Sequence, residues 1–94
     1  MAELVFEIWH DEATCSYEMS SVNEQNDKRH ATTMPTAVKV HTFTAGSDFE
    51  ASQKNYDWHG WGRWKPEPDW VEHFFTDEEA EEQRRYMESR TPGQ

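Results

Sequence analysis

The chain has 94 residues and a formal net charge of -10, from 19 Asp and Glu against 9 Lys and Arg. A chain of this length builds one small core, so we expect residues 1–94 to form a single domain. The acidic excess disfavours direct binding to nucleic acid or to anionic membrane surfaces, because Lys and Arg contact both. It is compatible with a basic protein partner or with solubility alone.

Cysteine use and the N-terminal segment predict the compartment. The single cysteine, Cys15, excludes an intramolecular disulfide and is typical of a reducing environment. The segment MAELVFEIWHDE carries acids where a secretory signal is positive, and its apolar run is too short. No stretch approaches the roughly 18 apolar residues that a bilayer span needs. We therefore expect a cytoplasmic protein with no membrane association.

Aromatic residues supply much of the apolar material. Leu, Ile, Val and Phe together make only 12 of 94 residues, whereas Phe, Trp and Tyr make 14% of the chain. A buried aromatic side chain removes about 150–250 Å² from water, so aromatics can replace the missing aliphatic residues. We therefore expect most tryptophans to lie in the core, Trp58 and Trp61 in particular and Trp64 and Trp70 less so.

Two strands are predicted at the start of the chain. Residues 3–10 alternate with period two, and residues 15–20 do the same after a turn-like break, which predicts a hairpin. On the second strand Cys15 is expected to be a small buried hydrophobe and not a nucleophile. Residues 21–24 have the form of a capping box, and the polar segment 26–33 predicts a short surface helix or an ordered loop.

The middle of the chain predicts a third strand and then a helix. Residues 37–45 are rich in β-branched side chains, as is typical of a strand. Ser47-Asp48-Phe49-Glu50 has the form of a second capping box, which opens a helix that runs to about Trp58. Gly60 is placed to end that helix as the residue after its last turn.

The last third predicts an extended connection followed by a helix. Two glycines and two prolines in residues 60–70 prevent regular helix there. A third capping box, residues 76–79, opens a helix that runs to about Arg90 and offers little apolar surface, with residues 91–94 as a disordered tail. The predicted fold is α+β: a small antiparallel sheet of about three strands packed against one or two helices.

The segments SDFEASQKNYDWHGWGRWKP and FTDEEAEEQRRYMESR, in the second half of the chain, carry a resemblance. Together they resemble small, uncharacterised bacterial cytosolic proteins. Those proteins share an acidic helix, an aromatic-glycine turn followed by Lys-Pro, and a final helix rich in Glu and Arg. The resemblance implies a class and a compartment, and it implies no activity.

No motif indicates catalysis, a metal or a cofactor. The five histidines and one cysteine lack the C-x-x-C, H-x-x-x-H and H-E-x-x-H spacings of metal sites. Phosphate-binding loops and the G-x-S-x-G elbow of hydrolases are also missing. We therefore assign no catalytic residue, no metal ligand and no cofactor.

The clearest surface signal is a run of acids among aromatic residues. Between Pro66 and Glu82 there are eight acids and no Lys or Arg. Such a run is typical of a solvated face, but exposed Trp and Phe beside it are also typical of an interface. We name the candidate partner-binding residues the acidic aromatic strip: Trp64, Glu67, Asp69, Trp70, Glu72 and Phe74.

These observations favour a small protein-interaction module without catalysis that binds a basic protein surface. A narrower form of this hypothesis is an inhibitor that imitates nucleic-acid charge and blocks a nuclease or a DNA-binding protein. One alternative is a small-molecule binder or enzyme with an aromatic pocket around Trp58, Trp61 and His59. A second alternative is a homodimer that uses the exposed aromatic residues.

Overall fold

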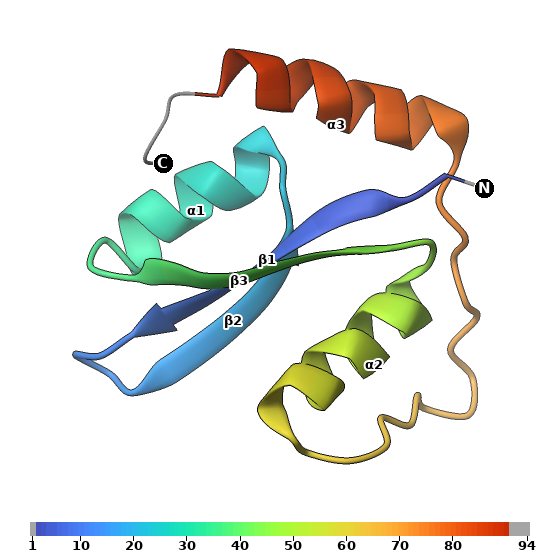
Figure 1. Cartoon of the computed structure of the whole chain (residues 1–94), viewed down its shortest axis with the longest axis horizontal. Helices are drawn as coiled ribbons and strands as arrows, with labels where there is room; N and C mark the ends of the chain where they lie inside the picture. The colour runs from blue at the N-terminus through green and yellow to red at the C-terminus, as the bar shows by residue number, and fades with distance from the viewer. Residues whose placement is uncertain (1, 91–94) are drawn as a thin grey trace.

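A computed structural model of the chain describes residues 2–90. Its elements in chain order are β1 (Leu4–Asp11), β2 (Ser16–Ser21), α1 (Glu24–Thr33), β3 (Val38–Ala45), α2 (Asp48–His59) and α3 (Asp77–Ser89). The strands form one antiparallel sheet in the order β2-β1-β3 (Figure 1). This confirms the predicted α+β class with a three-stranded antiparallel sheet. The structure contains three helices, whereas one or two were predicted to pack against the sheet.

The hairpin between β1 and β2 closes through a turn that includes Cys15. The last strand pair is Asp11 with Ser16. Cys15 has a φ of 55° and is exposed, with its Sγ 3.7 Å from the carbonyl oxygen of Glu12. The prediction that Cys15 is a buried strand residue is therefore wrong. The turn needs a residue in the left-handed conformation, and the alternating pattern gave no signal of where the turn would end.

The period-two pattern of β1 divides the sheet into two faces. Leu4 and Phe6 form the core with Ala45 and Ala51, so α2 covers this face. On the opposite face Glu7 contacts Arg90 at the end of α3, and the Trp9 ring lies 5.2 Å from the ring of His30 in α1. Figure 1 shows α1 and α3 on one side of the sheet and α2 on the other.

The tryptophans contribute less to the core than predicted. Trp58, Trp61 and Trp70 are 39%, 57% and 57% exposed, and Trp64 is half-buried. Fully or nearly buried apolar positions are held by smaller side chains, with Ile8 at 0% exposed. Because Ala51 lets α2 approach the sheet closely, little space remains for indole rings, and Trp58 stacks over His41 at the rim, with 5.4 Å between ring centroids.

The N-cap of helix α1 lies two residues after Ser21, the N-cap that the predicted capping box implies. Ser21 is still part of β2, and the N-cap is Asn23, whose side chain accepts a hydrogen bond from the backbone N–H of Asn26. The Nδ2 of Asn26 in turn donates to the carbonyl oxygen of Ser21 at 2.8 Å. Pairing of Ser21 with Phe6 in the sheet therefore takes precedence over its use as a cap.

Both ends of α2 and the start of α3 follow the predicted signals. Ser47 caps α2, and Gly60 ends it in the left-handed conformation with a φ of 72°. Thr76 and Glu79 form the predicted capping box at the start of α3. Polar contacts supply much of the docking of α3, because the buried amide of Gln83 bonds to backbone groups of Val5 and Val22. The predicted disordered tail, 91–94, lies outside the described residues.

Candidate functional site

The acidic aromatic strip lies on the extended connection between α2 and α3, which runs along one side of the molecule in Figure 1. Trp70 and Phe74 are 57% and 60% exposed, and Val71 between them is 87% exposed. Three large apolar side chains within five residues therefore face solvent. The extended, proline-stiffened backbone holds them outward because the core beneath is already filled.

Trp64 fixes one end of the strip to the rest of the molecule. Its ring lies edge-on to Phe49 at 5.2 Å between centroids, and Trp70 lies 6.4 Å away on a tilt of 30°. The backbone N–H of Trp64 donates to the side-chain oxygen of Gln53 in α2 at 2.9 Å. Trp64 thus contacts both Phe49 and Trp70 and is itself half-buried.

Glu67 and Asp69 carry the free negative charge of the strip. Both side chains are exposed. Within residues 2–90 neither takes part in an ion pair. A hydrogen bond of 3.0 Å from the N–H of Trp70 to the carbonyl oxygen of Glu67 closes a tight backbone turn that contains Asp69 and ends at Trp70. The charge of the two acids is available to a partner.

Glu72 differs from the other acids of the strip because it holds the fold together. It is half-buried, and its carboxylate accepts a hydrogen bond from the hydroxyl of Ser47, the N-cap of α2. Next to it, Asp48 accepts a hydrogen bond from the N–H of His73 at 3.0 Å. These bonds attach the strip to the start of α2, so Glu72 positions the strip and has less freedom to contact a partner.

The first turn of α3 continues the negative charge. Asp77 and Glu78 are exposed, whereas Glu79 is used by the capping box and by a hydrogen bond of 2.9 Å with His73. The hydrogen bond from the backbone of Thr76 lowers the pKa of Glu79, burial opposes this slightly, and His73 lowers it further. Asp77 and Glu78 thus extend the acidic surface beyond the strip.

The residues of the alternative aromatic pocket come together on the surface. His59 stacks on Trp61 with 3.9 Å between ring centroids, and Tyr17 meets the edge of His59 at 4.9 Å. Burial lowers the pKa of His59, which favours the neutral form of its ring. Trp58 and Trp61 remain open to solvent. A ligand pocket around these residues stays a prediction.

Two polar networks on the other face of the sheet were not predicted. In one, Arg90 joins Glu7 and Asp27; in the other, Glu18 contacts both Arg29 and His30. Their members come from different elements, and Arg90 and Glu7 are 83 positions apart in the chain. No local spacing in the sequence signals such contacts.

Residues 2–90 contain neither a metal-binding cluster nor a membrane-spanning helix. Among residues 2–90 no group of three or more His, Cys, Asp and Glu side chains is arranged to hold a metal ion. None of the helices in that range is both long enough and apolar enough to cross a membrane.

Comparisons of the chain with models of protein families, with curated proteins and with solved structures found no match. The residues and geometry of the chain itself are therefore the basis for assigning a function.

Proposed function

We propose that the chain is a small cytoplasmic protein-interaction module, without catalysis of its own, that binds a basic surface of another protein through the acidic aromatic strip. The observation that carries the proposal is the exposure of Trp70 and Phe74 beside two acids that have no ion-pair partner within residues 2–90. In its narrower form, the module imitates nucleic-acid charge and blocks a nuclease or a DNA-binding protein.

The aromatic and the acidic residues of the strip contribute to binding in different ways. Large aromatic side chains in a polar rim supply most of the binding free energy, because their burial removes much apolar surface from water. Exposed charges mainly accelerate association with a partner of opposite charge. Trp70 and Phe74 therefore serve as anchors, and Glu67 and Asp69 steer the partner. A second copy of this chain carries the same excess of acids, so charge favours a different, basic protein.

The test compares baits that differ only in where their charge is changed. One bait carries Glu67→Lys and Asp69→Lys; its matched control carries Glu12→Lys and Glu88→Lys, two exposed acids in the hairpin turn and in the last turn of α3. Both variants change the net charge by the same amount. We expect a basic protein that binds the parent and the control bait, but whose association with the strip variant is severalfold slower and less dependent on salt.

A third bait, Trp70→Ala, examines the anchor. Dissociation of the same partner should become about tenfold faster or more, since loss of an interface hot spot costs at least about 2 kcal/mol. Binding of identical partners by all baits would contradict the proposal, as would the absence of any basic partner. Self-association that the strip substitutions abolish, measured by sedimentation, would assign the strip to a second copy instead.

A further inference from the structure

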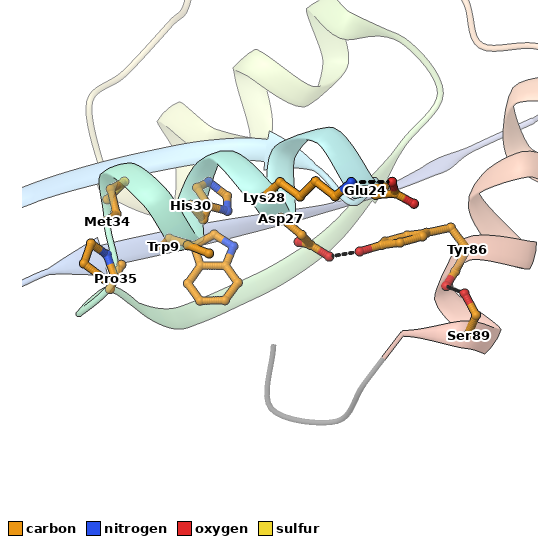
Figure 2. Close-up of a pocket in the computed structure, with 11 residues that line it drawn as sticks. Trp9, Glu24, Asp27, Lys28, His30, Met34, Pro35, Tyr86 and Ser89 are labelled. Carbon is orange, nitrogen blue, oxygen red and sulfur yellow. Dashed lines mark hydrogen bonds and ion pairs between the residues drawn. The ribbon is translucent and has the colours of Figure 1, made fainter.

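A cleft of about 670 Å³ lies on the face of the sheet opposite α2, between α1, the turn that follows it, and the end of α3. Figure 2 shows Trp9 beside His30, with Met34 and Pro35 at one end and Tyr86 at the other. Small-molecule sites occupy about 300–1,000 Å³ and are mostly apolar with a few placed polar groups. This cleft has that size, and its lining combines apolar and aromatic side chains with charged groups.

The aromatic walls of the cleft are held in place before any ligand arrives. The indole Nε1–H of Trp9 donates to Glu7 at 3.2 Å, and the Trp9 ring lies 5.2 Å from that of His30. The hydroxyl of Tyr86 donates to Asp27 (Figure 2). A planar ligand therefore meets ordered rings, and little side-chain entropy is lost when it binds.

His30 supplies an unused hydrogen-bond acceptor. The residue is 6% exposed, and its Nε2 bonds to the carboxylate of Glu18. Because an ionised carboxylate only accepts hydrogen bonds, Nε2 carries a proton, and in the neutral imidazole Nδ1 is then a bare acceptor. Nδ1 is buried and has no partner within residues 2–90. A buried acceptor without a donor costs about 1–3 kcal/mol, which a ligand with an N–H or O–H group would recover.

The charges around the cleft exclude an anionic ligand. Among residues 2–90, Lys28 is the only Lys or Arg of its lining, and it lies at the exposed rim, paired with Glu24 at 2.9 Å. The negative charge of Asp27 is balanced by an ion pair with Arg90, with 3.0 Å between the nitrogen and the oxygen. No free cation of the lining remains for a phosphate or a carboxylate. A neutral ligand avoids both repulsion from Glu24 and the cost of breaking the existing pairs.

We propose that this cleft binds a neutral, planar heteroaromatic molecule, which packs against Trp9 and donates an N–H or O–H hydrogen bond to Nδ1 of His30. Because Nδ1 is shielded from solvent, a lining side chain moves when the donor reaches it. Met34, unbranched and flexible, moves at the least cost. The proposal does not depend on the acidic aromatic strip, which lies on other elements.

The experiment titrates the full chain with indole and with 1-methylindole, which has the same ring system but no N–H donor. Binding is followed by NMR of the ¹⁵N-labelled protein, which resolves the Trp9 indole N–H and the backbone amides of residues 30–34, 36 and 37. Indole should shift these signals and bind about fivefold more tightly than 1-methylindole, the value of one net hydrogen bond. Equal binding of the two probes, or shifts confined to Trp58, Trp61 and Trp70, would overturn the proposal.

Three variants locate the site. Ala31 is exposed and lines the cleft, so Ala31→Trp fills it without touching a buried polar group and should abolish the indole shifts. His30→Phe keeps a ring beside Trp9 and should remove the preference for indole; if it fails to fold, Ala31→Trp alone decides. Trp61→Ala, which removes an exposed ring far from the cleft, should bind indole as the parent does. Unchanged binding by Ala31→Trp would overturn the proposal.

Discussion

Arg90 holds the last helix to the sheet through two buried acids. Its side chain is 9% exposed, and its guanidinium donates to Glu7 at 2.8 and 2.9 Å and to Asp27 at 3.0 Å. Asp27 also accepts the hydroxyl of Tyr86. Burial, and then the hydrogen bond to Asp27, raise the pKa of Tyr86 to about 12. One guanidinium thus satisfies acids from β1 and from α1.

Replacing Arg90 with Ala should lower the free energy of unfolding by about 3–5 kcal/mol, because it leaves the carboxylates of Glu7 and Asp27 without their main partner. The matched control is Arg85→Ala, which removes an exposed guanidinium paired with Glu81 and should cost about 0.5 kcal/mol or less. Urea denaturation followed by tryptophan fluorescence measures both values. Equal losses in the two variants would show that the buried network contributes no more than a surface pair.

At the scale of the element, α2 illustrates how local signals define a helix. Ser47 is 2% exposed, and its side chain accepts a hydrogen bond from the N–H of Glu50 at 3.1 Å. This bond satisfies one of the backbone N–H groups that are otherwise free at the start of a helix. At the other end, the N–H of Trp61 donates to the carbonyl oxygen of Tyr56 at 3.0 Å around Gly60. This reversal needs the left-handed conformation that Gly60 adopts.

Gly60→Ala should therefore destabilise the protein by about 1 kcal/mol, the lower end of the cost of the left-handed conformation for a residue with a Cβ. A Cβ at Gly60 has no atom within 4 Å, so the loss reports backbone strain alone. Gly46→Ala is the control, because its Cβ makes ordinary contacts at 3.6 and 3.7 Å and its φ is not positive. Thermal unfolding should separate the two variants; a stable Gly60→Ala protein would refute the strain argument.

At the scale of the whole molecule, charge is divided between two regions. Residues 28–47 contain no acid, whereas residues 67–82 contain eight acids and no Lys or Arg. Arg29, Lys39 and Arg90 are paired with acids on the sheet and α1. These three of the nine Lys and Arg are thereby paired within the fold, whereas Glu67 and Asp69 of the strip have no ion-pair partner within residues 2–90. That polarity is the basis of the proposed interaction.

The buried acids predict how stability changes with pH. Burial opposes ionisation of Glu7, but the hydrogen bonds and charge of Arg90, aided by Lys39, outweigh it and lower its pKa from 4.5. The unfolded chain therefore takes up this proton first as the pH falls. Stability from Glu7 is fully present above about pH 4.5 and is lost as the pH falls through the folded pKa.

Urea unfolding of the parent and of Glu7→Gln between neutral and acidic pH measures this contribution. The difference in free energy of unfolding between the two proteins should be largest at neutral pH and should shrink below about pH 4.5. Comparing the two proteins cancels the relief of repulsion among the many surface acids, which acts in the opposite direction. A difference that stays constant over this range would rule out a lowered pKa for Glu7.

Local patterns by themselves determined the elements of this protein. Period-two alternation located β1 and β2, and β-branched content located β3. The Ser47 and Thr76 caps located the starts of α2 and α3, and Gly60 located the end of α2. These signals suffice because each depends on neighbours within a few residues. Local patterns did not rank the tryptophans correctly: Trp70 was expected to be less buried than Trp61, and both are 57% exposed.

Only the tertiary structure decided which side chains meet and which remain exposed. Trp58 lies at the rim because Ala51 brings α2 close to the sheet, and Cys15 faces solvent because the hairpin closes one residue later than the alternation indicates. Arg90 forms an ion pair with Glu7 because α3 packs over one face of the sheet. His30 lines a cleft with Trp9 because α1 packs over the same face. Contacts between distant segments depend on how the elements pack, and no short stretch of sequence carries that information.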